Sequence, residues 1–183
     1  MKKIIFPILV LMLIVGSNSC QEKIDIEKEK EAIKAVIEQG LAAYYEADYD
    51  QFVNNWIHGP YILVSYASKD GQSQYKGWQE LDKAFKQHAS NYDSIQQAGN
   101  WEYVSFENYD YTIRVYQQCA WASFNSKFIF TWQEANYDRE SFQVCFLERH
   151  EGEWKIIYSG WVDLYSYEQA EEKSAEEDPE TED

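Results

Sequence analysis

The residues best placed by type and spacing to do chemistry are His88 and Asp163. His88 shares one helical stripe with Leu81 and Phe85, so its side chain is expected to point toward the interior or the mouth of the domain. A histidine there acts as a general base when a carboxylate orients it, and Asp163 is the carboxylate considered for that role. The alternative is a core or rim histidine whose nitrogens are satisfied by hydrogen bonds. His58 and His150 fall in predicted loops and are expected to be exposed.

Arg114 and Asp163 each interrupt a largely apolar or aromatic strand pattern. A buried arginine needs a carboxylate partner, so the two could pair across a sheet or hold the polar end of a ligand. Strands alternate faces, however, so each side chain could equally point outward to water.

Aromatic residues make up 17% of the chain, including 7 Trp and 15 Tyr. A pocket built from them would be apolar with polar tips, which suits flat hydrophobic ligands or sugars stacked on rings. Tyr44 and Phe130 are expected to contribute to its lining. The residues predicted for the pocket itself are Tyr45, Trp56, Tyr61, Trp78, His88, Tyr103, Arg114, Trp132 and Tyr158. The alternative is that these rings fill a core and cover a dimer interface.

Metal and disulfide signals are weak. The chain has no Cys-x-x-Cys, no His-x-x-x-His and no calcium-loop spacing, so no metal site and no cofactor are expected. Cys119 and Cys145 fall on neighbouring predicted strands, where the partner of Cys145 is expected near residue 126, about seven positions from Cys119 and too far for a disulfide. Both are expected to be buried thiols.

The N-terminus has the three parts of a secretion signal: Lys2 and Lys3, an apolar run over 4–15, and a small polar stretch that ends at Cys20. The run is shorter than the roughly 20 residues that span a bilayer. Its end resembles a lipobox, although Ser17 stands where leucine is usual, so cleavage after Ser19 without lipidation is the alternative. We expect a signal peptide at 1–19, lipidation of Cys20, and export to the cell envelope of a bacterium, either periplasmic or at the cell surface.

The charge pattern divides the rest of the chain. The formal net charge is −16, and residues 168–183 hold nine acidic residues and one lysine, which is half of it. Such a segment is typical of a disordered tail that solvates the protein or docks a basic partner. We expect a linker at 20–27, one domain at 28–167 and the acidic tail at 168–183. An acidic body without a basic cluster excludes nucleic acid as a natural partner.

Hydrophobic spacing predicts three helices followed by strands. A long amphipathic helix is expected at about 25–46, and a short one opens at Asp48, whose side chain can cap it with Gln51 three places on. A strand at 61–66, a turn at Asp70 and Gly71, and a helix at about 77–91 follow.

From 101 to 164 the pattern predicts four antiparallel strands, with breaks at 107–108, 117–118, 135–136 and 151–153. Apolar residues on both faces of 120–132 indicate a sheet that curls round a core and offers its outer face to a partner.

Several local motifs resemble the nuclear-transport-factor-2-like superfamily, and within it the SnoaL-like domains. They are Leu41-Ala42-Ala43-Tyr44-Tyr45-Glu46-Ala47-Asp48, Gly77-Trp78-Gln79-Glu80-Leu81, Ile113-Arg114-Val115-Tyr116 and Glu151-Gly152-Glu153-Trp154-Lys155-Ile156. The resemblance covers about 28–165 and implies an α+β fold in which a cone-shaped, curved antiparallel sheet packs on three N-terminal helices, as in cystatin-like folds. The superfamily hosts isomerases, cyclases, dehydratases and non-enzymatic binding domains, so the fold alone does not give the activity.

Two departures from the superfamily bear on function. The last strand reads Tyr158-Ser159-Gly160-Trp161 where SnoaL-like relatives often carry a His-x-His-Ser-like run. The tyrosine and base aspartate of ketosteroid isomerases align near Gly40 and Val64, neither of which can do that chemistry. The leading interpretation is a non-enzymatic domain that binds a small apolar or aromatic ligand or forms a homodimer through its sheet. The alternatives are a cofactor-free isomerase, cyclase or dehydratase, and an envelope protein-interaction module.

Overall fold

The computed structural model describes residues 24–69, 71–98, 101–132 and 135–164, with the side chains at 93, 95–97, 101, 132, 135 and 136 excepted. The predicted signal peptide, the lipidation site Cys20 and the acidic tail lie outside the described residues. The first described helix begins at Ile26, within the predicted linker. No helix in the described part of the chain is both long and apolar enough to cross a membrane.

Three helices form where the hydrophobic spacing predicts them: α2 (Ile26–Tyr45), α3 (Tyr49–Asn55) and α4 (Trp78–Gln97). Each of the first two begins at an aspartate. Asp25 accepts a hydrogen bond from the backbone N–H of Lys28 at 3.2 Å, and Asp48 accepts one from that of Gln51 at 3.0 Å. These caps satisfy N–H groups that have no partner inside the helix. Helix α4 extends past the predicted end at 91, because its polar second half carries no apolar stripe to mark it.

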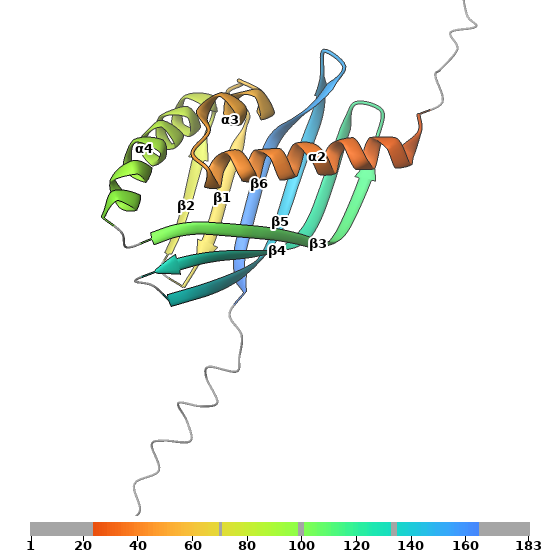
Figure 1. Ribbon diagram of the computed structural model, residues 1–183. Coiled ribbons are helices and arrows are strands. Elements are labelled where there is room, and N and C mark those ends of the chain that lie inside the picture. The colour runs from red at the N-terminus through yellow and green to blue at the C-terminus, as the bar shows by residue number, and fades with distance from the viewer. Residues whose placement is uncertain (1–23, 70, 99–100, 133–134, 165–183) are drawn as a thin grey trace, which may run out of the picture.

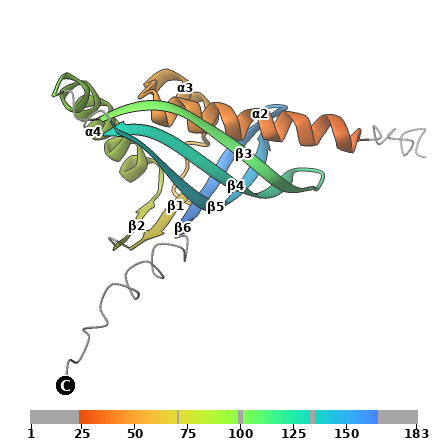
Figure 2. The same ribbon diagram turned by 60° about the horizontal axis from the view of Figure 1, so that its bottom comes forward.

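Six strands in the described part of the chain form one sheet in the order β2-β1-β6-β5-β4-β3. The strands are β1 (Leu63–Ser68), β2 (Gly71–Lys76), β3 (Trp101–Val115), β4 (Cys119–Trp132), β5 (Ala135–His150) and β6 (Glu153–Leu164). All neighbours are antiparallel except β1 and β6. Figures 1 and 2 show the long strands bending and the three helices lying on one side of the sheet. The predicted α+β cone is therefore confirmed.

The sequence did not predict β2, and it placed a break in β3 wrongly. Strand β2 is polar and largely exposed, so it lacks apolar alternation, and its six residues are ordered by pairing with β1. In β3, Glu107 and Asn108 pair with Lys127 and Ser126 without interruption. The irregularities lie instead on either side of them, and one is at Asp110, which has a positive φ of 55°.

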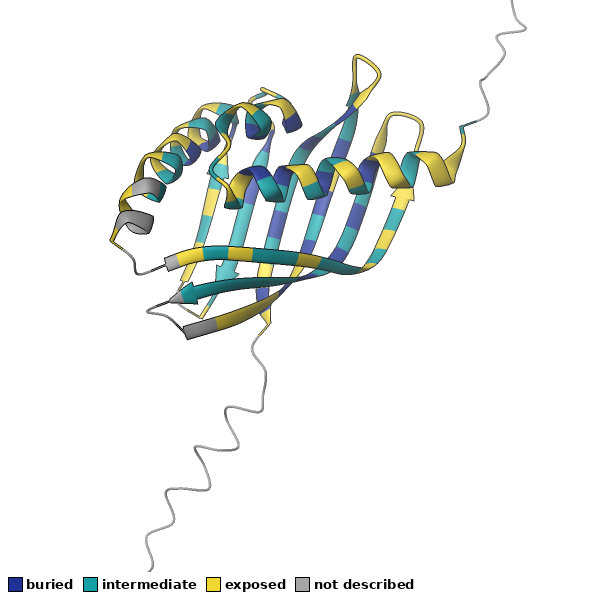
Figure 3. Ribbon diagram, viewed as in Figure 1, coloured by how far each residue is buried: buried dark blue, intermediate teal, exposed yellow. Residues whose placement is uncertain are grey.

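The core fills the space between the helices and the concave face of the sheet, where Figure 3 shows the buried residues gathered. Phe52 of α3 and Phe85 of α4 stack with ring centroids 3.9 Å apart. Leu147 of β5, Trp154 of β6 and Ile156 of β6 are also buried. Apolar burial of this kind is the main force that holds helices to a sheet.

The two described cysteines occupy different environments. Cys145 is buried and lies opposite Ala122 rather than near residue 126, while Cys119 lies opposite Glu148 and is exposed. The expectation of two buried thiols is wrong for Cys119, because it begins β4 at the edge of the core. Three strand positions still separate the two residues, about 10 Å along the strand, which is beyond disulfide geometry. Burial raises the pKa of the Cys145 thiol to about 12, so it is not a thiolate near neutral pH.

Candidate functional site

A cavity of about 570 Å³ lies between the helices and the concave face of the sheet. Helix α2 contributes the segment from Ile37 to Tyr45, α4 contributes the segment from Leu81 to His88, and β5 and β6 form the opposite wall. The volume is within the range of roughly 300–1,000 Å³ that is usual for small-molecule sites.

The helical wall of the cavity is apolar and rich in rings. Its members include Leu41, Tyr44, Tyr45, Phe52 and Phe85. The three residues of α2 face the cavity because helical residues three or four apart share a face, and their positions continue the stripe that buries Ile33 and Ile37. Such a wall favours the apolar body of a ligand over water.

Tyr45 connects this wall to the sheet. Its ring stacks on Phe128 of β4, with centroids 4.4 Å apart. Burial is the main cause that raises the pKa of Tyr45, and the neighbouring tyrosines Tyr44 and Tyr103 add to it. The phenol therefore stays protonated at neutral pH, and it can donate or accept a hydrogen bond.

The sheet wall carries polar groups beside its rings, because alternate residues of β5 and β6 point into the cavity. Strand β5 supplies Arg139, Ser141 and Gln143, and β6 supplies Ser159 and Asp163. Residues two apart on a strand share a face, and the register places Ser141 opposite Asp163. Gln143, Ser141 and Asp163 are 3%, 8% and 7% exposed, so these polar groups are set into the core rather than on the rim.

Two buried polar atoms in the lining residues have no hydrogen-bond partner among the described residues: Gln143 Oε1 and Trp56 Nε1. The amide of Gln143 is held on its other side, where Nε2 donates to Ser141 Oγ at 3.2 Å. Leaving a buried polar atom unpaired costs about 1–3 kcal/mol, so folded proteins rarely keep such atoms without a use. An acceptor and a donor in residues that line the cavity are thus left unpaired.

Asp163 carries a negative charge into the cavity wall. Its side chain is 4% exposed, and its Oδ2 lies 3.6 Å from Nη1 of Arg139, a side chain that is 55% exposed. A tight charged pair has its atoms about 2.7–2.9 Å apart, so this pairing is loose. Both the outward position considered for Asp163 and its pairing with Arg114 are wrong. Arg114 is exposed, as an outward position requires.

His88 lines the same cavity, but its contacts are those of an anchored rim residue. Its Nε2 donates to the backbone carbonyl oxygen of Tyr44 at 2.9 Å, and its ring stacks on that of Tyr44 at 4.5 Å. The carboxylate of Asp163 forms an ion pair with Arg139 and not with His88. A catalytic histidine needs a carboxylate to orient its ring. The hydrogen bond that His88 makes goes to a backbone carbonyl and not to a carboxylate.

Of the residues predicted for the pocket, Tyr45, Trp56 and His88 line the cavity, and so do Tyr44 and Phe130. Tyr103 lies behind this lining and stacks on Tyr45 at 5.6 Å. The side chain of Trp132 lies outside the described residues.

The other predicted pocket residues lie elsewhere. Tyr61 is 58% exposed and donates to Glu148, and Trp78 stacks on His58. Arg114 is exposed, and a bulge between Ile156 and Tyr158 turns Tyr158 to the face opposite Ser159. Strand parity near a bulge cannot be counted from the sequence, which explains the error at Tyr158. Four polar lining residues were missed, although the alternation of Arg139, Ser141 and Gln143 was a usable signal.

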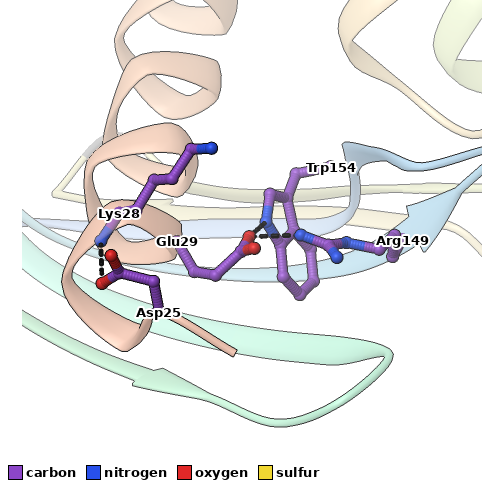
Figure 4. Close-up of polar contacts among 5 residues, drawn as sticks. All are labelled: Asp25, Lys28, Glu29, Arg149 and Trp154. Atoms are coloured by element: carbon purple, nitrogen blue, oxygen red, sulfur yellow. Dashed lines mark hydrogen bonds and ion pairs between the residues drawn. The ribbon is translucent and has the colours of Figure 1, made fainter. Parts of the chain in front are cut away.

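A second polar cluster lies at the other end of α2 (Figure 4). Glu29 accepts hydrogen bonds from Arg149 Nη2 and from Trp154 Nε1, the latter at 2.7 Å. The guanidinium of Arg149 also lies over the Trp154 ring, 4.9 Å from its centroid. The hydrogen bond from Arg149, followed by that from Trp154, lowers the pKa of Glu29. This cluster ties the first turn of α2 to the β5–β6 hairpin.

No group of three or more His, Cys, Asp or Glu in the described residues is arranged to hold a metal ion. The polar lining of the cavity includes hydrogen-bonding groups and the ion pair of Arg139 with Asp163. Such a lining can orient a polar ligand group beside an apolar body.

The sequence profile of the SnoaL-like domain matches residues 33–160, so the chain belongs to the SnoaL-like domain family. This match includes β1 to β5 and the first part of β6, whereas the cavity-lining residues Trp161 and Asp163 lie beyond its end. No curated protein matches the chain.

Solved structures of the nuclear-transport-factor-2-like group share the fold. A protein with a cystatin-like fold from Novosphingobium aromaticivorans has 15% identity and a TM-score of 0.58, over 80% of this chain and 89% of that one. A superfamily protein from Salmonella enterica has 15% identity and a TM-score of 0.56, over 77% and 94%. A ketosteroid isomerase-like protein from Erwinia carotovora has 12% identity and a TM-score of 0.51, over 74% and 95%. At these identities the likeness shows the fold alone.

Proposed function

We propose that this SnoaL-like domain binds a small ligand that has an apolar or aromatic body and a hydrogen-bonding polar end. The observation that supports it is the cavity of about 570 Å³, with rings on the helical wall and buried polar groups on the sheet wall. The apolar body would pack on Tyr45 and Phe85, and the polar end would face Gln143.

Binding without catalysis is favoured by what the cavity lacks. Gly40 and Val64, the positions that align with the catalytic tyrosine and aspartate of ketosteroid isomerases, both line the cavity and carry no group for that chemistry. His88 is held by the carbonyl of Tyr44, and Asp163 by Arg139. Proton abstraction beside a carbonyl requires a base and an oxyanion donor aimed at one substrate.

Thermal unfolding with a panel of indoles, lipophiles and glycans tests the proposal. A ligand at 100 times its Kd adds about 2.7 kcal/mol to the free energy of unfolding, and 1 kcal/mol shifts Tm by roughly 2–4 °C at this chain length. Ala84→Trp places an indole at the cavity lining and should abolish the shift, whereas Ser90→Trp, at an exposed position on the same helix, should keep it. No shift with any compound would overturn the proposal.

A second candidate function is self-association through the outer face of the sheet. Phe142 and Phe146 of β5 and Val162 and Leu164 of β6 are between 42% and 51% exposed and lie on the side opposite the cavity. Contiguous exposed apolar surface usually marks an interface. Phe146→Asp should shift a homodimer to monomer in analytical ultracentrifugation. A wild-type protein that stays monomeric at high concentration would contradict self-association. That result would favour another envelope protein as the partner of this face.

We further propose that the domain is exported and held at the bacterial envelope membrane by lipid on Cys20. The support is the three-part signal that ends at that residue. Mass spectrometry of the mature N-terminus should find a diacylated or triacylated Cys20, and Cys20→Ser should release the protein from the membrane fraction. An unmodified Cys20 in the wild-type protein would overturn the anchor.

A further inference from the structure

The charges of the cavity are unequally exposed to water. Among the described residues that line it, Asp163 and Arg139 carry the formal charges, and their side chains are 4% and 55% exposed. Water and salt screen an exposed charge much more strongly than a buried one. The potential inside the cavity is therefore set mainly by the carboxylate, and the net charge of the whole chain, −16, has the same sign.

The neutral polar groups next to Asp163 also favour a ligand group that donates hydrogen bonds. Gln143 Oε1 is buried and lacks a hydrogen-bond partner in the described structure, while Nε2 of the same amide is used by Ser141. The group that Gln143 offers to the cavity is therefore an acceptor. A carboxylate and an amide oxygen on adjacent strands make a pair of acceptors for N–H groups.

Rings surround this acceptor pair. Trp161 lies two residues before Asp163 on β6 and lines the cavity with it, and Phe128 lies opposite Arg139 in the register of β4 and β5. Tyr45 stacks on Phe128. The negative faces of aromatic rings attract cations.

We propose that the ligand carries a protonated amine on an aromatic or apolar body, and that the ammonium donates to the carboxylate of Asp163 and to Gln143 Oε1. This inference rests on the proposed binding function and gives its ligand class. In the free protein, the loosely held guanidinium of Arg139 occupies the carboxylate, and the ligand ammonium displaces it toward water. A ligand with a carboxylate or phosphate head is rejected, because its charge would face Asp163 at short range.

Three probes with one indole body and different heads test this: tryptamine, 3-ethylindole and indole-3-propionate. Isothermal titration of the purified protein should give a Kd for tryptamine at least tenfold below that for 3-ethylindole, and the weakest binding for indole-3-propionate. Asp163→Asn should bring the tryptamine and 3-ethylindole affinities within about twofold of each other. The matched control is Glu140→Gln, an equal charge change at an exposed position of β5, and it should leave the tenfold preference intact.

Arg139→Gln tests the displacement at an exposed position where folding is not at risk, and it should tighten tryptamine binding severalfold. The outcomes separate the two claims. If 3-ethylindole binds and tryptamine binds no better, or indole-3-propionate binds best, the amine inference is overturned and the binding function stands. If none of the three probes binds saturably, the amine inference is overturned, and the thermal-unfolding panel of lipophiles and glycans then decides the binding function.

Discussion

The two ends of helix α2 meet the sheet in opposite ways. At its N-terminal end, Glu29 accepts hydrogen bonds from Arg149 and Trp154, and the side chains close on one another. At its C-terminal end, Tyr44 and Tyr45 overlie a cavity in whose wall Asp163 lies 3.6 Å from Arg139, a longer ion pair than that of Glu29 with Arg149. Both ends use a carboxylate and an arginine from β5, yet only one end pairs them tightly.

This difference separates a structural cluster from a binding site. A tightly hydrogen-bonded carboxylate such as Glu29 stabilises the fold, although Nε of Arg149 beside it has no partner among the described residues. Unpaired polar atoms around a cavity lower stability and retain binding capacity. We therefore expect substitutions at the closed end to change the free energy of unfolding, and those at the cavity end to change binding.

The largest expected effect is a matched pair of leucine truncations. Leu147 is fully buried in β5, and Leu147→Ala should lower the free energy of unfolding by about 4 kcal/mol, near the upper part of the range for leucine in a well-packed core. Leu81 lines the cavity, where contacts are already missing on one side, so Leu81→Ala should cost about 2 kcal/mol. Chemical denaturation measures both. An equal or reversed order would show that the cavity end is packed as tightly as the closed end.

The next effect concerns the Glu29 cluster. Glu29→Gln removes the charge from two hydrogen bonds and should cost about 2 kcal/mol in the free energy of unfolding, within the range of 1.5–3 kcal/mol for charged hydrogen bonds. Glu27→Gln is the control, because Glu27 is 80% exposed and pairs with Lys30 of the same helix. Its effect should stay below about 0.5 kcal/mol. Equal losses for the two variants would refute the structural role of the cluster.

The stability difference between wild type and Glu29→Gln should depend on pH. The pKa of Glu29 in the folded protein is lowered from its ordinary value of 4.5, mainly by Arg149. The contribution of the carboxylate is therefore complete above that value and is lost as the pH falls through the folded-state pKa. Urea unfolding of both proteins in steps from pH 7 to pH 3 should show a constant gap that closes below about pH 4.5. A gap that is as large at pH 3 as at pH 7 would contradict the assigned cause.

The smallest effect on stability is expected at the cavity carboxylate. Asp163→Asn removes a buried charge whose desolvation cost offsets a loose ion pair with an exposed arginine, so the free energy of unfolding should change by less than about 1 kcal/mol. The same denaturation measurement checks it. A loss as large as that of Glu29→Gln would show that Asp163 is structural rather than part of a binding site.

The fold could be predicted from the sequence because helix periodicity and capping are local signals. The N-cap at Asp48 and the apolar stripe of α2 depend on neighbours within one or two turns. Strand β2 could not be predicted in the same way, since its polar residues are ordered by pairing with β1 rather than by their own pattern.

The site was predictable only in part. The rings of Tyr45 and Trp56 were found because aromatic residues gather in cores and pockets. The polar wall was missed, because the inward direction of Ser159 depends on the bulge near Ile157 and on the register between β5 and β6. Asp163 was noticed for its charge, but its partner is set by the sheet register and not by any sequence spacing.

Two tryptophan indoles report on the two ends of helix α2 in one experiment. Trp56 lines the cavity and its Nε1 has no partner among the described residues, whereas Trp154 Nε1 donates to Glu29 at 2.7 Å. In a ¹⁵N–¹H correlation spectrum titrated with 3-ethylindole, we expect a saturable shift of the Trp56 indole resonance and an unchanged Trp154 resonance. A Trp56 resonance that stays fixed at saturating probe, or a Trp154 resonance that moves equally, would contradict the claim that the open end of α2 covers a ligand site.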